Sequence, residues 1–496
     1  MILPGTRRRG AALVICVAAL FIIWHTQVLS VLFQFSKSRE AADIIPHTVP
    51  PEPDMVSEHT PSITADLSSA RAPFISWPLR RLCTEQVEAN AVVPGLVFLC
   101  DNNSGGPGNI RNYILTCVRY AIEAGATGLQ IPRIRTRSAS NKADLFKEYQ
   151  PLDYMFSEAH FKTAMETSCP HIALFPANGE AGGLDAIPGV AAKAAREKLS
   201  PERMVRRVTP KEYGGTRGGC DQRDPNRHTD RFGHAFRKSM RELAADLGHA
   251  PTSWENPMLV RLSWGVLWDW PVMRDGPELA ATFGGLLRIR EDILGLADQI
   301  VQSMRELATS AAEKSGSARA SDRDEGLERG GPNGVFLGVH LRTEEDALSQ
   351  WPTYENQSNG YIYKAEKHKF RGGVAYLASG SEKETQRFSQ DARARLDLKV
   401  RSKYDLVQGQ ELEKLKSLSW DQQALVDFAV LLESDYFVGV SPSSFSINVA
   451  LKRHLQKEGL YTRPWKVATS DTRSWLVGWY SSYWDDWLFM FDGMWP

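Results

Sequence analysis

The chain has 496 residues, of which 59 are basic and 59 are acidic, so its formal net charge at pH 7 is zero. This balance does not favour a nucleic-acid surface or a polybasic membrane patch, because both need an excess of Lys and Arg. The length that remains after a short N-terminal region is enough for two lobes.

The N-terminal region combines a basic start with a long apolar run. Arginines occupy positions 7–9, and residues 11–35 are mostly apolar. About 20 apolar residues can span a bilayer, and the basic residues stay on the cytosolic side. We therefore expect a cytosolic tail at 1–10 and a signal-anchor helix at 11–35. This gives a single-pass type II protein of the Golgi or ER membrane, with its body in the lumen. A cleaved signal peptide is the alternative, because residues 11–24 alone fit its apolar segment.

Residues 36–73 are rich in proline and poor in large apolar side chains. Such a segment cannot bury enough surface to offset the entropy lost on ordering, so it predicts a disordered stalk. Five cysteines would share the oxidising lumen, where disulfides persist. Because five is odd, at least one thiol stays free or pairs with another chain, and the sequence leaves the pairing open. These cysteines are Cys83, Cys100, Cys117, Cys169 and Cys220.

The first predicted unit is a strand, a glycine-rich loop and a helix. Residues 93–100 are apolar and short, and residues 101–109 are a dense cluster of turn formers. Apolar side chains from Ile110 onward repeat with helical spacing, and Gly125 supplies a C-terminal stop. The helix amino end near Asn109 is a natural position for an anion. A plain tight turn that binds nothing is the alternative.

The second predicted unit follows residues 313–333, whose Ser, Gly and charged residues indicate a mobile linker. A buried strand at 335–339 then ends in alternating polar side chains. These are His340, Arg342, Glu344 and Asp346. Ligands of open α/β sheets bind at the carboxyl ends of strands, and the planar fork of arginine suits a phosphate. The alternative is a strand that is followed by solvent-exposed charged residues with no binding role.

A similar unit closes the second half of the chain. Residues 422–432 predict a helix and residues 436–440 a buried strand. Ser443 and Ser444 are good N-cap residues for a further helix at 447–455. Their hydroxyl groups and amides could hold phosphate oxygens, although ordinary helix capping is the alternative.

Alternating strands and helices on both sides of the linker predict an α/β protein with two doubly wound lobes and a cleft between them. We place the first lobe at 74–312, the second at 334–474, and an aromatic C-terminal tail at 475–496. The tail tryptophans could bind sugars, or they could pack between the lobes.

Three segments together resemble the GDP-fucose protein O-fucosyltransferase superfamily, and its fungal branch in particular. The first is Gly105-Gly-Pro-Gly-Asn-Ile-Arg-Asn-Tyr-Ile-Leu115, a glycine-rich loop that opens a helix. The second is the His-x-Arg motif at His340–Asp346. The third runs over Leu425–Ser446 and contains Asp, then Ser-Asp-x-Phe-Val-Gly, then Ser-Ser-Phe. Their order and spacing carry the resemblance.

The resemblance implies a GT-B-like fold of two Rossmann-like lobes, with GDP bound mainly by the second lobe. It implies that the protein moves fucose, or a related sugar, from a GDP-sugar to a hydroxyl of a protein or glycan acceptor. The transfer would invert the configuration at the anomeric carbon of the sugar. It would use neither a metal ion nor another cofactor. Arg342 would contact the diphosphate, and Asn109 would reach the phosphates and sugar from the first lobe. The other implied ligand-binding residues are Gly106, Gly108, His340, Asp427, Ser443, Ser444 and Phe445.

Two departures from the family pattern bear on catalysis. Gly106 stands where some members have a glutamate that acts as general base, and Pro107 replaces an arginine of some relatives. The base is therefore unassigned, with Glu344 and Asp346 candidates by proximity alone. One alternative is a non-catalytic, membrane-tethered lectin-like or scaffold relative. The other is a GT-B enzyme that uses a different nucleotide sugar.

Two sequence patterns raise the question of a metal ion. Asp322-Arg-Asp324 lies in the predicted linker, where it would hold a metal poorly. The spacing of a second group does not match usual zinc sites, so solvated loop is the preferred interpretation. That group is Cys220, His228, Asp230 and His234.

Overall fold

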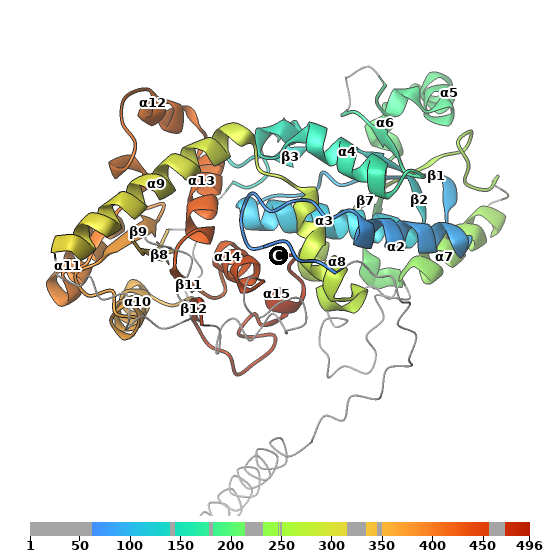
Figure 1. The fold of residues 1–496 in the computed structure, drawn as a ribbon. Helices are drawn as coiled ribbons and strands as arrows, with labels where there is room; N and C mark the ends of the chain where they lie inside the picture. Colours follow the sequence, from blue (N-terminus) through green and yellow to red (C-terminus); the bar gives the residue numbers. More distant parts are fainter. Residues whose placement is uncertain are drawn as a thin grey trace, which may run out of the picture. The chain divides into compact units, whose positions relative to one another are not determined.

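The computed structural model describes the chain from residue 62, with several gaps (Figure 1). The described residues are 62–138, 144–177, 182–213, 232–246, 248, 250–314, 334–344, 350–455 and 472–496. The predicted cytosolic tail, signal anchor and most of the stalk lie outside them, as do Cys220 and Asp346. Residues from Thr64 onward form one compact unit, to which everything below belongs. In the described part of the chain, no helix combines the length and apolar character needed to cross a membrane.

The first lobe is built on a five-stranded parallel sheet with the order β5-β2-β1-β7-β6. Its strands are β1 (Val93–Leu99), β2 (Ala126–Gln130), β5 (Ala173–Phe175), β6 (Arg206–Val208) and β7 (Met258–Leu262). A separate antiparallel hairpin pairs β3 (Ile134–Arg135) with β4 (Tyr149–Gln150). The chain thus begins the sheet at its centre and adds strands on either side, which creates a switch point between β1 and β7.

The helix that follows β1 is α3, and its sequence explains both of its ends. It runs over Pro107–Ala124, so proline occupies the first turn. The N–H groups of a first turn have no partner within the helix, so a proline there costs no helical hydrogen bond. Gly125 closes the helix at a φ of 79°, a conformation that favours glycine. The other helices of this lobe are α2 (Trp77–Glu88), α4 (Glu158–Ser168), α5 (Pro188–Glu197), α6 (Pro201–Met204), α7 (Phe232–Asp246) and α8 (Pro277–Thr282).

The second lobe repeats this plan with the order β10-β9-β8-β11-β12, again all parallel. Its strands are β8 (Leu337–His340), β9 (Val374–Ala378), β10 (Lys399–Arg401), β11 (Tyr436–Val440) and β12 (Ser474–Val477). Its helices are α10 (Tyr354–Lys367), α11 (Glu382–Leu396), α12 (Gly409–Ser417), α13 (Trp420–Leu432), α14 (Ser444–His454) and α15 (Phe489–Asp492). Its switch point lies between β8 and β11. The predicted mixed α/β fold with parallel sheets is confirmed.

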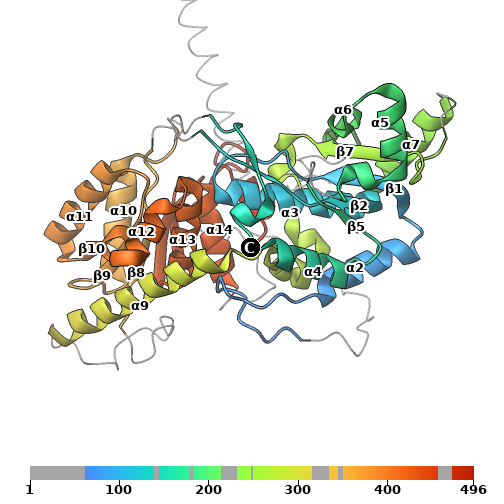
Figure 2. The same ribbon diagram turned by 90° about the horizontal axis from the view of Figure 1, so that it is seen from above.

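Two boundaries differ from the sequence prediction. Helix α9 (Glu291–Lys314), which we assigned to the first lobe, packs on α13 and β9 of the second (Figures 1 and 2). The predicted disordered stalk also ends earlier than residue 73. Leu67 is buried, and Arg71 forms ion pairs with Glu291 and Asp298 of α9. Ser69 also donates to Glu433, and the Leu67 carbonyl accepts from Lys452, so several contacts hold this segment although its composition is typical of disorder.

The C-terminal residues pack between the lobes. Trp495 is fully buried, and its N–H donates to Asn112 of α3 while its carbonyl accepts from Asn448 of α14. Arg111 donates to the same carbonyl. This arrangement favours interlobe packing over sugar binding for Trp495, and it connects α3 to α14.

Two disulfides answer the question that the cysteine count left open. Cys83 of α2 pairs with Cys169 just after α4, and Cys100 at the end of β1 pairs with Cys117 of α3. In the chain-entropy account, a cross-link across 86 residues stabilises more than one across 17. The second bond also fixes the strand and helix that flank the glycine-rich loop.

Replacing Cys83 and Cys169 together by serine should lower the free energy of unfolding by about 2–4 kcal/mol, because the unfolded chain regains the freedom of a long loop. Guanidinium unfolding of the oxidised protein measures this loss. The same experiment on a Cys100→Ser, Cys117→Ser variant should give a smaller loss. An unchanged midpoint for the first variant would contradict the structural role of that disulfide.

Candidate functional site

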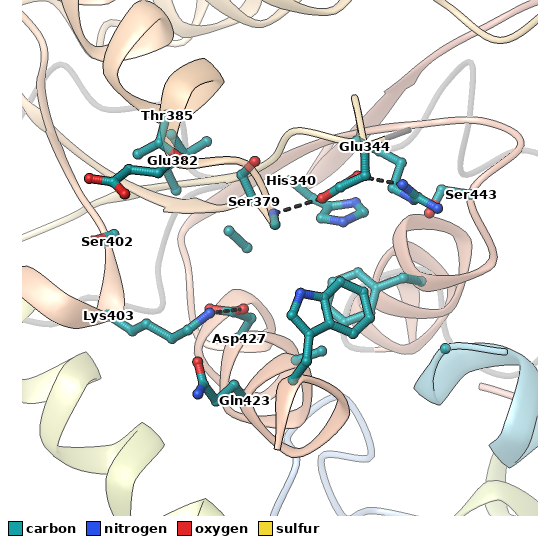
Figure 3. A pocket seen from close by; sticks show the side chains of 18 of the residues that line it. His340, Glu344, Ser379, Glu382, Thr385, Ser402, Lys403, Gln423, Asp427 and Ser443 are labelled. Carbon is teal, nitrogen blue, oxygen red and sulfur yellow. Dashed lines mark hydrogen bonds and ion pairs between the residues drawn. The ribbon is translucent and has the colours of Figure 1, made fainter. Parts of the chain in front are cut away.

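A cavity of about 1240 Å³ lies where the carboxyl ends of the second sheet face the amino end of α3. All nine residues proposed from the sequence line it. They are Gly106, Gly108, Asn109, His340, Arg342, Asp427, Ser443, Ser444 and Phe445. Because they come from both lobes, the cavity brings together segments that are more than 300 residues apart in the chain. Figure 3 shows its second-lobe wall.

Arg342 follows β8, and its position is fixed by its backbone as well as by its side chain. Buried Gln357 accepts from the Arg342 N–H at 3.0 Å and donates to its carbonyl at 2.8 Å. The guanidinium forms an ion pair with Glu344 and lies 5.6 Å from the centre of the Trp351 ring. Two hydrogen bonds of Gln357 thus hold the Arg342 backbone, and the contacts with Glu344 and Trp351 hold its guanidinium at the cavity wall.

Glu344 is held on two sides. One carboxylate oxygen contacts Arg342 and the other accepts from the Gly380 N–H at 2.7 Å (Figure 3). Burial is the largest single influence and would raise its pKa, but the charge of Arg342 and the hydrogen bonds to the carboxylate together outweigh burial and keep the pKa of Glu344 below its usual value. A carboxylate with a lowered pKa and both oxygens engaged is a poor general base. Asp346, the other base candidate, lies outside the described residues.

His340 ends β8 and is buried at the cavity wall. Its Nδ1 shares a hydrogen bond of 2.6 Å with Ser446 Oγ, and its ring stacks at a tilt on Phe445 with 4.5 Å between centroids. Burial lowers the pKa of His340 from its ordinary value of 6.5 to about 4. The imidazole is therefore neutral at pH 7, which leaves the positive charge of this wall to Arg342.

The amino end of α14 forms the adjacent part of the wall. Ser443 caps this helix by accepting from the Ser446 N–H, and it lines the cavity together with His340 (Figure 3). Ser446 in turn accepts from the Val440 N–H, so the loop after β11 is fixed by side chains of its own helix. The first-turn amides of α14 point out of the helix and can meet an anion.

The amino end of α3 faces this helix from the first lobe. A Cβ on Gly108 would lie 3.0 Å from the Ser444 carbonyl, which is tighter than ordinary van der Waals contact, so the absence of a side chain favours the close approach of the two helix ends. At the next residue, the Oδ1 atom of Asn109 is buried and has no hydrogen-bond partner among the described residues. A buried amide oxygen is rarely left unpaired in a folded protein. The Asn109 amide is therefore a position where a ligand would complete the hydrogen bonding.

Asp427 lines another part of the cavity, where neighbouring side chains engage both of its carboxylate oxygens. Its two oxygens accept from Tyr376 Oη at 2.6 Å and from Lys403 Nζ at 2.7 Å. The ion pair with Lys403 is visible in Figure 3. Asp427 thus enters the site as part of a buried triad. The other labelled residues that line the cavity are Ser379, Glu382, Thr385, Ser402 and Gln423.

Sequence reasoning missed three residues that shape the cavity. Gln357 holds the backbone of Arg342, Lys403 neutralises Asp427, and Arg137 reaches the cavity from the β3–β4 hairpin. None of them belongs to a recognisable motif, and each pairs with a partner distant in sequence. In the described part of the chain, no group of three His, Cys, Asp or Glu side chains is arranged to hold a metal ion.

Three comparisons with known proteins bear on this site. A family model described as GDP-fucose protein O-fucosyltransferase matches residues 96–456, well over half of the chain. No curated protein matches the chain significantly.

Solved structures show similarity at low identity. POFUT1 in complex with GDP-fucose is 12% identical with a TM-score of 0.39, over 78% of this chain and 100% of that one. An Arabidopsis thaliana FUT1 mutant in complex with GDP is 11% identical with a TM-score of 0.32, over 75% of this chain and 71% of that one. The fucosyltransferase NodZ from Bradyrhizobium is 13% identical with a TM-score of 0.33, over 72% of this chain and 92% of that one.

Burial of His340 should make the stability of the protein depend on pH. The unfolded imidazole binds a proton below about pH 6.5, whereas the folded one stays neutral until its pKa of about 4. The free energy of unfolding should therefore fall as the pH is lowered through this window. Between about pH 7 and 4.5, His340 should account for about 2–3 kcal/mol of the fall.

Urea unfolding of the wild type and of a His340→Asn variant at both pH values isolates this contribution. The wild type should lose more stability on acidification than the variant does. The same loss in both proteins would contradict the lowered pKa of His340.

Proposed function

The chain belongs to the GDP-fucose protein O-fucosyltransferase family, which makes it a glycosyltransferase, and we propose that it transfers fucose from GDP-fucose to a hydroxyl of a protein or glycan acceptor. The observation that carries the proposal is the convergence of Arg342, Asn109 and the amino ends of α3 and α14 on one cavity. The two parallel sheets that face this cavity support a GT-B-like arrangement of lobes.

The chemistry of the reaction fits these groups. The acceptor oxygen bonds to C1 of the sugar while the bond from C1 to the β-phosphate oxygen breaks, which inverts C1. The departing diphosphate gains negative charge, and fixed donors aimed at that charge lower the barrier. Arg342 and the helix amides are such donors. They can meet the charge of a diphosphate without a metal ion, which is how we propose that this site works.

The proton of the acceptor hydroxyl also needs a destination. Glu344 is a poor base because its oxygens are bound by Arg342 and Gly380. Gly106, at the N-cap of α3, has no side chain to accept a proton. We therefore assign the proton to an oxygen of the departing phosphate, with Asn109 holding the sugar and phosphate in place.

The compartment is also a proposal. Two buried disulfides in the first lobe support a site of action in an oxidising compartment of the secretory pathway. This agrees with the type II Golgi or ER membrane protein expected from residues 1–35, whose body would lie in the lumen.

A thermal-shift comparison of GDP, UDP and ADP tests the choice of nucleotide. A ligand that binds only the folded state at about 100 times its Kd adds about 2.7 kcal/mol of stability. GDP should therefore raise the Tm clearly, and UDP and ADP should not. A response to UDP alone would move the enzyme to another donor class, and no response to any nucleotide would favour a non-catalytic scaffold.

Arg342→Ala should abolish transfer and weaken GDP binding by about 100-fold, because charge-assisted bidentate contacts to phosphate are lost. Arg342→Lys should recover little, since lysine presents a point charge without a fork. Calorimetric titration with GDP and a transfer assay with labelled GDP-fucose measure both effects.

Arg371→Ala is a matched control, because Arg371 lies outside the cavity in an exposed ion pair with Glu366. It should leave GDP binding and transfer unchanged. Wild-type transfer by Arg342→Ala would remove the role that we assign to Arg342.

A further inference from the structure

Arg137 is a second arginine of the cavity, and it comes from the first lobe. It follows strand β3 at the start of the hairpin, and its side chain is only 8% exposed. It lines the same cavity as Arg342. A Cβ on Gly106 would lie 3.6 Å from its Nη2 atom, so the guanidinium lies beside the N-cap of α3. Arg137 thus brings a positive charge to the helix end that carries Asn109.

The same side chain also contacts the second lobe. Its Nε atom is 3.3 Å from Oδ1 of Asp421 on α13, and its Cζ atom is 4.6 Å from the centre of the Trp420 ring. Asp421 is itself buried. Stacking on an aromatic ring holds the plane of a guanidinium in a fixed orientation. The orientation of Arg137 is therefore set by the second lobe, although its backbone belongs to the first.

Burying a charged pair in this way is expensive, because both groups lose their hydration. A hydrophobic contact between the hairpin and α13 would join the lobes at lower cost. An arginine at this position is explained if its charge has a further role. Binding an anionic ligand in the cavity that Arg137 lines would be such a role.

We propose that Arg137 binds the diphosphate of the sugar donor from the first-lobe side, opposite Arg342. This inference rests on the proposed function, since it names a further residue for the same donor. Arg137 reaches the diphosphate with a terminal nitrogen, while Nε and the ring face remain on Asp421 and Trp420. The donor is then held by a cation from each lobe.

A purely structural strut is the competing role, and two ligands distinguish it from ours. A strut would affect any ligand of the cavity, whereas a phosphate contact affects GDP and spares guanosine. In calorimetric titrations of the full-length protein, Arg137→Ala should weaken GDP binding by about 10-fold or more. It should change guanosine binding by less than about threefold, since no charge-assisted contact is lost there.

Asp421→Asn is the matched control, because it removes the ion pair between the lobes but keeps Arg137. It should leave GDP binding within about threefold of wild type if the charge of Arg137 acts on phosphate. Arg137→Lys keeps a charge and most of the stem, so it serves if Arg137→Ala does not fold. It should retain the wild-type Tm within a few degrees and still bind GDP several-fold more weakly, because it lacks the fork.

Three results would overturn the inference: an equal loss for GDP and guanosine in Arg137→Ala, a loss in Asp421→Asn as large as in Arg137→Ala, or unchanged GDP binding in both Arg137 variants. Failure of the proposed function looks different. In that case the wild-type protein itself would not bind GDP.

Discussion

The close approach of two helix ends, α3 at Gly108 and α14 at Ser444, is the constraint on which the site depends. Any side chain at Gly108 would contact the backbone of Ser444 and Phe445 at 3.0–3.1 Å. With glycine there, the amino end of one helix from each lobe opens into a single cavity. Partial positive charges of two helix ends then face the same volume, which predisposes it to bind an anion.

Several contacts remote from the cavity keep these helix ends together. Asn112 of α3 and Asn448 of α14 both bind the buried backbone of Trp495, so the C-terminal residues connect the two helices behind the cavity. The disulfide between Cys100 and Cys117 fixes α3 to the strand before it. These bonds are far from any reacting atom, yet they set the separation of the groups that would meet the donor. Preorganised donors are effective because they need no rearrangement as charge develops.

Much of the site could be predicted because its residues lie at the ends of regular elements. A buried strand that ends in His340 and Arg342, and serines that open a helix after β11, are local patterns. In a parallel sheet these patterns meet at the switch point between β8 and β11. Local sequence together with a general rule of topology was therefore enough to bring Arg342 and Ser444 to one cavity.

The remaining features depend on pairings between distant segments, which no local pattern encodes. Gln357 binds the Arg342 backbone from a helix that shows only ordinary amphipathic spacing. Helix α9 precedes the predicted linker in sequence and was therefore assigned to the first lobe, although it packs on α13 and β9 of the second. Leu67 and Arg71 likewise depend on distant pairings, because their partners on the body decide whether that segment is ordered.

Two cations of the cavity are paired with carboxylates, and this shapes how a donor would bind. Arg342 and Lys403 each hold a carboxylate, on Glu344 and Asp427. Bare cations in a shared cavity would repel one another and leave their positions poorly defined. A paired carboxylate instead holds each cation in place. It also neutralises part of the cation's charge, so the cation attracts phosphate less strongly. A diphosphate must therefore share or displace Glu344 at Arg342. Because Glu344 is also held by the Gly380 N–H, sharing requires less rearrangement than displacement. The carboxylate then continues to orient the guanidinium while the phosphate binds its remaining donors.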